Sequence, residues 1–342
     1  MTVCFIHIIH DQKKLRFKMT HILTHVHLYY IDMWPEIKEK LANITVSYDL
    51  FVTLNNRNEQ LQQDILNFKN DAVIQIVDNR GFDVGPFIKL LNSVDLDQYD
   101  YIIKLHTKRN MPEGFSLQGY DMSFGKHRKY LMKFLESQNT FNRCLNAFDS
   151  DKILGMIGDF HIICRKDKSG RCVVKKGQEL LKAAGFPEQE YPFILGTMFM
   201  VRAALFKPVL RLKLDFNDFT PSIRGHDILP YGLEAFFGFV IHAQRYEIKD
   251  VMTPRYAQIC ARFFALLSRL VYRKKVTVDG HVTIKLFKIP VFVRRNPPPP
   301  SHTLGNINGK YLLSQILAGL RIRRSFLEKS FQTFSPGLLI LR

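Results

Sequence analysis

The sequence is short of cysteine, and its few cysteines form no recognisable site. The 342 residues include five cysteines, an odd number, and no two of them are spaced as Cys-x-x-Cys. Cys164 and Cys172 are a loop apart, but no cluster of histidine or cysteine completes a zinc set around them. The pattern favours reduced thiols in a cytosolic protein over disulfides or a structural metal.

Long uncharged apolar runs are also missing. No stretch of about 20 residues is free of charge, so a membrane-spanning helix is not expected. The nearest candidate, 259–272, contains Arg262 and Arg269. The apolar segment 1–10 is followed by its basic residues, which is the wrong order for a secretory signal peptide.

Acidic residues are outnumbered by basic ones, 31 to 49, which gives a net charge of +18. Residues 260–342 hold 15 basic and 2 acidic residues, whereas the first 259 residues hold 34 and 29. The body is therefore nearly balanced, and the tail is the part expected to seek an anionic surface. With 46% hydrophobic and 23% charged residues, the composition is globular and excludes wholesale disorder, collagen and coiled coil.

Apolar strands and amphipathic helices alternate along the body of the chain. This alternation predicts an α/β fold, a mostly parallel sheet flanked by helices on both faces. Strands are expected at 22–30, 49–54, 72–77, 101–105, 153–157 and 195–201. Helices are expected at 34–41, 57–68, 86–91, 126–136, 141–148, 179–184, 203–210 (broken at Pro208) and 231–244.

The chain becomes basic and amphipathic beyond Tyr256. A helix is expected at 259–272, a hairpin around Asp279-Gly280, a stiff spacer at 297–300 and a second basic helix at 311–331. Three parts are therefore expected: a globular domain at 1–256, a helix and hairpin at 257–296, and a spacer with a final helix at 297–342. The amphipathic faces would either lie on an anionic membrane or pack on the globular domain.

The segment 79–86, N-R-G-F-D-V-G-P, joins a predicted strand to a predicted helix. Gly81 and Gly85 would let the backbone approach a ligand, and the helix start would offer N–H groups to an anion. Asn79 lies in the same loop, and Asp83 would accept hydrogen bonds from a ribose or sugar hydroxyl. A tight turn with Asp83 as the helix N-cap explains the same residues, and the motif alone favours that simpler interpretation.

A second segment, 104–109 (K-L-H-T-K-R), ends a predicted inner strand, where open α/β sheets bind their ligands. His106 and Lys108 alternate with Thr107 and are expected on one side, where they suit a diphosphate. Arg109 follows them. A solvated basic loop is an equally good interpretation.

Glu234 is a lone acid in the apolar helix start L-P-Y-G-L-E-A-F-F-G. Apolar surroundings would raise its pKa and suit a general base, although a favourable charge near a helix N-terminus is a sufficient explanation. Asp227 and Asp159 are weaker candidates. The three histidines at 21, 25 and 27 are better explained as alternating strand residues than as metal ligands.

These motifs together resemble the rhamnan synthesis protein F family of bacterial glycosyltransferases. The resemblance runs from about His21 to Val251. It rests on G-F-D-V-G-P-F, Y-D-Y-I-I-K-L-H-T-K-R, L-G-T-M-F-M-V-R and a Glu at the start of an amphipathic helix. It implies a GT-A-like nucleotide-sugar fold, with Gly196 and Met198 beside the donor sugar and Glu234 as the base. The residues before Glu234 depart from the family pattern, and only Asp227 keeps an acid there.

The resemblance also bears on metal use. Related GT-A enzymes carry Asp-x-Asp, which holds a divalent metal, where this sequence has His106-Thr107-Lys108. A lysine neutralises a diphosphate directly, so no divalent metal is expected, with Mg²⁺ or Mn²⁺ left open. Asp159 is a further candidate on the donor side.

The expected function is transfer of a sugar, such as rhamnose or another deoxyhexose, from a nucleotide-diphosphate donor to a lipid-linked cell-surface glycan. The protein would be cytoplasmic and peripheral on the inner face of the cell membrane, held there by its tail. The alternatives are a non-catalytic scaffold of a glycan-assembly complex and a basic nucleic-acid-binding protein. The second alternative is less favoured because the charge lies in amphipathic helices and no aromatic–basic motif is evident.

Overall fold

The computed structural model describes residues 20–113, 115–165, 171–221, 228–276, 282–286 and 289–294. The chain divides into two compact units, Met1–Arg269 and Leu270–Arg342. The spacer and final helix expected at 297–342 lie outside the described residues, and the boundaries expected at 256 and 296 stay predictions.

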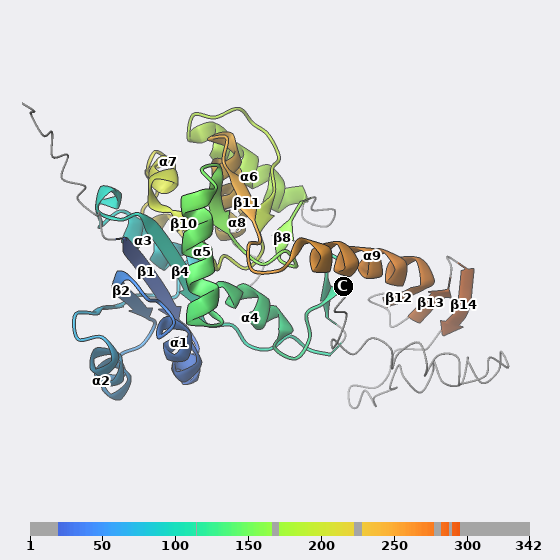
Figure 1. The fold of residues 1–342 in the computed structure, drawn as a ribbon, viewed down its shortest axis with the longest axis horizontal. Coiled ribbons are helices and arrows are strands. Elements are labelled where there is room, and N and C mark those ends of the chain that lie inside the picture. Colours follow the sequence, from blue (N-terminus) through green and yellow to red (C-terminus); the bar gives the residue numbers. More distant parts are fainter. Residues whose placement is uncertain are drawn as a thin grey trace, which may run out of the picture. The chain divides into compact units, whose positions relative to one another are not determined.

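A seven-stranded sheet forms the centre of the first unit (Figure 1). Its strand order is β11-β7-β10-β4-β1-β2-β3, and neighbours run parallel except at β10, which is antiparallel to both β4 and β7. The predicted mostly parallel sheet is therefore confirmed. The strands are β1 (His21–Leu28), β2 (Ser47–Leu54), β3 (Val73–Ile76), β4 (Tyr101–His106), β7 (Leu154–Ile157), β10 (Phe199–Arg202) and β11 (Glu247–Lys249). Two short antiparallel pairs accompany the sheet, β5 (Ser116–Leu117) with β6 (Tyr120–Asp121) and β8 (Ile163–Cys164) with β9 (Phe193–Ile194).

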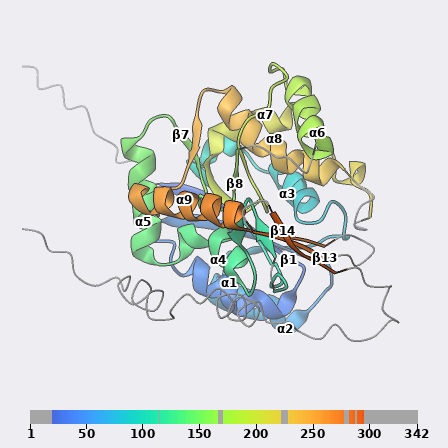
Figure 2. The same ribbon diagram turned by 90° about the vertical axis from the view of Figure 1, so that its right-hand side faces the viewer.

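Helices cover both faces of this sheet, with α5 on one side and α3, α6 and α8 on the other (Figure 2). The helices are α1 (Trp34–Leu41), α2 (Glu59–Phe68), α3 (Val84–Leu91), α4 (Lys126–Leu131), α5 (Gln138–Ser150), α6 (Arg171–Ala183), α7 (Lys207–Leu210) and α8 (Leu229–Ala243). Successive residues of β4 face opposite layers. Tyr101 stacks on Phe148 of α5 at 4.6 Å between ring centroids, while Lys104 lies over the ring of Phe87 in α3.

A cluster of phenylalanines fills the space between β10, α3 and α8. Phe87, Phe199, Phe206 and Phe237 are all buried, and the rings of each pair lie 5.3–6.3 Å apart. Edge-to-face and tilted pairs at these distances stabilise a core beyond their buried area. This core supports the carboxyl ends of β1 and β4, where the candidate site lies.

Three predicted elements differ from the observed ones in ways that affect the site. The strand expected at 195–201 begins only at Phe199, because Gly196 and Thr197 adopt left-handed backbone angles that no strand accommodates. The helix expected from Tyr231 begins at Leu229, with Pro230 in its first turn, so Glu234 lies in the second turn. The helix expected at 203–210 is a 3₁₀ turn, Ala203–Phe206, followed by α7.

The helix predicted at 259–272 is confirmed as α9 (Arg255–Val271), which crosses the boundary between the two units. In the second unit, β12 (Tyr272–Val276), β13 (Val282–Leu286) and β14 (Ile289–Arg294) form an antiparallel sheet. The pairing of β12 with β13 confirms the predicted hairpin. Among the described residues, no helix is long and apolar enough to cross a bilayer.

Candidate active site

The candidate site is organised around Gly196 and Thr197, which we call the Gly196–Thr197 loop. Both residues have left-handed φ, +86° and +51°, and this angle is costly for a β-branched side chain. The Gly196 N–H donates to the carboxylate of Glu234, and the Gly196 carbonyl lies 2.8 Å from Nε2 of His106. The Lys104 ammonium donates to the Thr197 carbonyl and hydroxyl at 3.2 and 3.0 Å. Two residues thus connect side chains from β4 and α8.

Asp83 and Lys104 form a buried ion pair beside this loop. Lys104 is fully buried, and its ammonium donates to the Asp83 carboxylate, which also accepts from the Thr197 hydroxyl. Burial alone would raise the pKa of Asp83, but His106, Lys104 and the Thr197 hydroxyl hold it well below its usual range. Burial lowers the pKa of Lys104, and Asp83 opposes that shift. The Asp83 carboxylate is therefore held in its ionised form beside the Lys104 ammonium, and the pair fixes the loop after β3 against β4.

The interpretation of Asp83 as a helix cap is confirmed for its position but not for its side chain. Asp83 occupies the N-cap position of α3, but its side chain makes no capping hydrogen bond. The two glycines beside it do have a structural role. A Cβ at Gly81, where φ is +63°, would lie 2.4 Å from the ring of Phe219, and one at Gly85 would lie 2.2 Å from the Arg80 carbonyl. The glycines allow the tight turn that places Asp83 over Lys104.

Two amide side chains near the ends of β2 and β3 have unused hydrogen-bonding capacity. The Oδ1 atoms of Asn79 and Asn55 are buried and have no hydrogen-bond partner among the described residues. The Nδ2 group of Asn55 donates to the carbonyl of Val77, two residues before Asn79, at 3.3 Å. A buried acceptor without a partner is costly, so this edge suits a ligand that brings N–H or O–H donors. Asn55 had not been singled out from the sequence.

His106 and Lys108 have different environments at the end of β4. The ring of His106 is buried, with Nδ1 3.1 Å from the Thr107 carbonyl and Nε2 near Gly196. Burial lowers its pKa, while Asp83 and the Gly196 carbonyl oppose that shift, and the contact of Nε2 with the Gly196 carbonyl positions the Gly196–Thr197 loop. Lys108 is half-buried, and no carboxylate among the described residues forms an ion pair with its ammonium. Of the two, Lys108 is the cation available to a ligand.

Arg109 and Met198 are held by other parts of the protein. The Arg109 guanidinium makes two hydrogen bonds to Asp32, at 2.7 and 2.9 Å, and lies over the ring of Tyr30. Met198 is fully buried behind the Gly196–Thr197 loop. Their assignment to the donor stays a prediction; Arg109 has structural partners and Met198 is part of the buried core.

Glu234 has the electrostatic character that the sequence predicted. Burial raises the pKa of its carboxyl to about 7, and Asp83 adds to the rise, while the Gly196 N–H and Lys108 oppose it. A carboxyl group with this pKa exchanges protons near neutral pH, which is what a general base requires. Because Glu234 lies in the second turn of α8, an interaction with the helix N-terminus is a weaker explanation for it than the sequence suggested.

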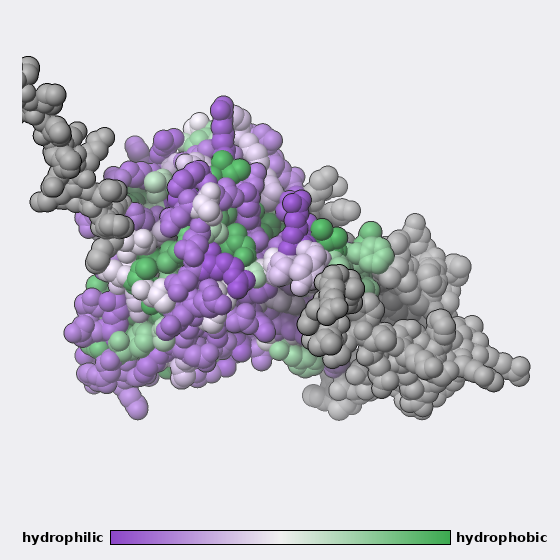
Figure 3. Space-filling model, in the orientation of Figure 1, coloured by the Kyte–Doolittle hydropathy of each residue, from purple (hydrophilic) through white to green (hydrophobic). Residues whose placement is uncertain are grey.

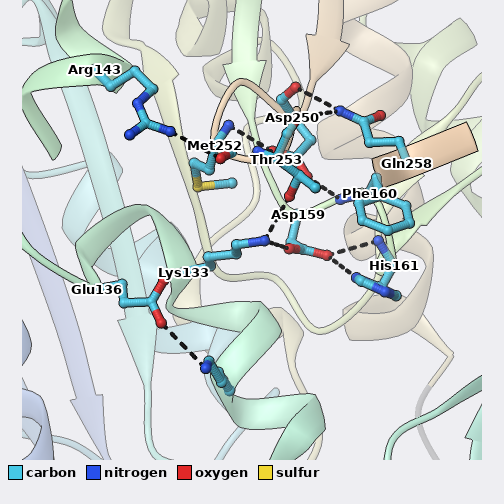
Figure 4. Close-up of polar contacts among 11 residues, drawn as sticks. Lys133, Glu136, Arg143, Asp159, Phe160, His161, Asp250, Met252, Thr253 and Gln258 are labelled. Carbon is cyan, nitrogen blue, oxygen red and sulfur yellow. Dashed lines mark hydrogen bonds and ion pairs between the residues drawn. The ribbon is translucent and has the colours of Figure 1, made fainter. Parts of the chain in front are cut away.

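Asp159 lies in a different cluster, at the end of β7 (Figure 4). Its carboxylate accepts from the N–H and from Nδ1 of His161, at 2.8 and 2.6 Å, and pairs with Lys133 at 2.9 Å. The Lys133 ammonium also donates to the hydroxyl of Thr253, at 2.6 Å. Asp159 is fully buried, and these contacts join the end of β7 to the 3₁₀ turn Lys133–Leu135 and not to the Gly196–Thr197 loop.

The remaining candidates concern metal and proton transfer. Asp227 lies outside the described residues. His25 and His27 both contact the hydroxyl of Thr53, at 3.1 and 2.9 Å, and burial lowers the pKa of His27 to about 3. Both are buried residues of strand β1, as expected, but they face the same side of the sheet instead of alternating. Within the described ranges, no three His, Cys, Asp or Glu side chains are grouped to hold a metal ion; metal independence stays a prediction.

The structure thus brings Asp83, His106 and Glu234 to one loop, at the carboxyl edge of a mostly parallel sheet. Lys104 and Thr197 lie inside segments that the sequence singled out, but sequence reasoning gave neither residue a role of its own. One sequence feature could have identified Lys104: it is the single charged residue in the apolar run Y-I-I-K-L. A charged side chain in a buried strand needs a partner, so this pattern indicates a buried ion pair.

A buried charged network with a carboxyl group of raised pKa, at the carboxyl edge of an α/β sheet, is typical of a ligand-binding or catalytic site. Residues 3–246 match the profile of the family described as Rhamnan synthesis protein F. That match covers well over half of the chain, and the protein belongs to this family.

Similar proteins come from several bacteria. An uncharacterized protein, WxcX, of Xanthomonas campestris pv. campestris (strain B100) is 21% identical over 238 residues, which are 66% of this chain and 32% of that protein. The chain therefore spans about a third of the length of this relative. Among solved structures, S. aureus TarS 1-349 is 12% identical, with a TM-score of 0.32 and coverage of 64% of this chain and 55% of that one. Glucosyl-3-phosphoglycerate synthase of Mycobacterium tuberculosis, in complex with Mn²⁺ and uridine diphosphate, is 10% identical, with a TM-score of 0.34 and coverage of 82% and 91%.

Proposed function

We propose that the protein is a glycosyltransferase with a GT-A-like fold that uses a nucleotide-diphosphate sugar. The observation that carries this proposal is Glu234, a carboxyl group with a pKa of about 7 held by the Gly196 N–H beside the Lys108 cation. Sugar transfer from a diphosphate needs a proton acceptor for the incoming hydroxyl and a cation for the departing diphosphate, and both groups lie at this edge of the sheet. Family membership supports the same activity.

The donor would lie along the ends of β2, β3 and β4. Asn55 and Asn79 offer unpartnered acceptors to the nucleoside, Asp83 lies beside its ribose or sugar, and Lys108 meets the diphosphate. The Gly196–Thr197 loop, backed by Met198, would contact the donor sugar. The loop's strained angles are fixed by Lys104 and His106, so this surface is formed before the donor arrives.

The transfer would be a single displacement. An acceptor hydroxyl loses its proton to the Glu234 carboxylate while its oxygen forms a bond to the anomeric carbon. The bond between that carbon and the diphosphate oxygen breaks, and its electron pair stays on the diphosphate, where Lys108 neutralises the developing charge. One carboxylate suffices because no covalent intermediate forms, so the anomeric configuration inverts.

The substrates we propose follow the family. The donor carries a hexose or deoxyhexose such as rhamnose, and the acceptor is a growing lipid-linked polysaccharide or lipopolysaccharide chain at the inner face of the cell membrane. A thermal-shift screen of nucleotide sugars tests the donor, since a bound ligand stabilises the folded state by mass action. Release of nucleoside diphosphate on addition of a glycan acceptor tests the enzyme. If no nucleotide sugar stabilises the protein and none is turned over, the scaffold alternative replaces the proposal.

Lys108→Ala is expected to weaken donor binding by about 1.5–3 kcal/mol, the contribution of one charge-assisted contact. Calorimetry with the donor found in the screen measures the change, with and without Mg²⁺ or Mn²⁺. Lys182→Ala removes an exposed lysine of α6 and serves as the control. Binding and turnover of the unmodified protein should persist in EDTA, and complete loss with rescue by Mn²⁺ would contradict a metal-free diphosphate site.

A further inference from the structure

Over residues 255–266, the helix α9 presents its large apolar side chains to solvent. Twelve large apolar residues are exposed among those that the structure describes, and five of them lie on α9. Their exposed fractions range from 57% to 72%, and they are Tyr256, Ile259, Phe263, Phe264 and Leu266. Elsewhere the molecular face in Figure 3 is mostly hydrophilic, with apolar residues in separate groups. We call these five residues, with Arg255 and Arg262, the α9 outer face.

The opposite side of α9 has small residues. Ala257, Ala261 and Ala265 recur every four positions and are half-buried, as is Gln258. A helix that packs on a core places its large apolar residues inward. Here the order is reversed, since alanines take the inner side and aromatic residues the outer. Soluble monomers rarely expose a contiguous apolar surface of this kind unless it binds something.

The charges around this surface indicate what binds it. Residues 255–271 contain no acidic residue, and Arg255 and Arg262 lie together along one edge of the apolar residues. Two copies of such a helix would bring like charges together, whereas an anionic lipid surface complements both the arginines and the apolar side chains.

We infer that the α9 outer face binds the surface of an anionic lipid bilayer, with the aromatic residues in the headgroup boundary and the arginines at lipid phosphates. This inference deepens the proposed function: the membrane contact would place the protein beside a lipid-linked acceptor, and that consequence rests on the proposed glycosyltransferase activity. α9 is fixed to the sheet edge that carries the site. Gln258 donates to the carbonyls of Asp250 and Thr253, at 3.3 and 2.9 Å, and Thr253 accepts from Lys133, the partner of Asp159 (Figure 4).

These contacts give the cluster around Asp159 a role. They connect the start of α9 to the carboxyl ends of β7 and β11. These strand ends lie at the same edge of the sheet as the Gly196–Thr197 loop. A bilayer bound to α9 is thereby held at the edge where transfer takes place, which suits an acceptor anchored in lipid.

Vesicle flotation of the full chain tests the inference. Vesicles of phosphatidylglycerol and phosphatidylethanolamine should carry the protein, and vesicles of phosphatidylcholine alone should carry much less. The double variant Arg262→Glu/Phe263→Glu should lower the partition coefficient on anionic vesicles about tenfold or more. Lys152→Glu/Ile153→Glu is the matched control, because it also replaces one basic and one apolar residue of an adjacent exposed pair by glutamate, and it should float normally.

The outcomes separate this inference from the proposed function. Donor-induced thermal stabilisation should be equal in both double variants, which shows that each is folded and has its donor site. Unchanged flotation of the α9 variant would overturn the inference and leave the glycosyltransferase proposal in place. A dimer of the unmodified protein in sedimentation, converted to monomer by the α9 substitutions, would overturn it in favour of a second copy.

Discussion

Replacing Glu234 by glutamine is expected to lower the rate of sugar transfer about 10²–10⁴-fold and to leave donor binding intact. Glutamine keeps the size and polarity of the side chain but cannot take a proton from the acceptor hydroxyl. The Gly196 N–H would still find an acceptor in the amide oxygen, so the Gly196–Thr197 loop should keep its conformation. Turnover with saturating donor and acceptor measures the first effect, and calorimetry with donor the second.

The control for this substitution is Glu179→Gln, which removes a half-exposed carboxylate of α6 that pairs with Lys176. It should turn over normally. If Glu234→Gln also kept near-normal turnover, Glu234 would be removed from the mechanism. Asp227 would then be tested as the base, followed by Asp159.

The same carboxyl group predicts a pH dependence. The base acts in its ionised form, and burial raises the pKa of Glu234 to about 7. The transfer rate should therefore be low at pH 5, increase through a midpoint near pH 7, and level off above it. A pH profile of kcat measures this, and a midpoint near the ordinary value for glutamate would show that the environment of Glu234 does not control the rate.

Lys104→Met is expected to destabilise the protein by about 3–5 kcal/mol, because it leaves the Asp83 carboxylate buried without its partner. The Thr197 carbonyl and hydroxyl lose a donor as well, at a loop that already has unfavourable backbone angles. Urea denaturation followed by circular dichroism measures the free energy of unfolding.

Two further variants identify the cause of this destabilisation. Asp83→Asn/Lys104→Met removes both charges and should recover part of the lost stability, since no unpaired charge remains. Lys207→Met breaks an exposed pair with Asp97 and should cost no more than about 1 kcal/mol. If Lys104→Met were as mild as Lys207→Met, the Asp83–Lys104 pair would not be what holds the site together.

The class of fold could be predicted from the sequence because it depends on local patterns. Apolar runs such as Y-I-I-K-L-H alternate with amphipathic segments, and each segment specifies its own element. Gly81, Gly85 and the lone Glu234 also had local signals: two glycines where a strand meets a helix, and one acid in an apolar helix. The residues next to them in the sequence were enough to identify all three as candidates for the site.

The network that connects these residues was decided by tertiary structure alone. Lys104 and Thr197 are 93 residues apart, and Asp83 and Thr197 are 114 apart. A sequence pattern reports which face of its own element a residue occupies, but not which distant side chain completes its hydrogen bonds. The same reason explains why β10 could not be placed correctly. The residues just before it, 195–198, were expected to belong to the strand, but Gly196 and Thr197 bind His106, Glu234 and Lys104, and these contacts hold them in a loop.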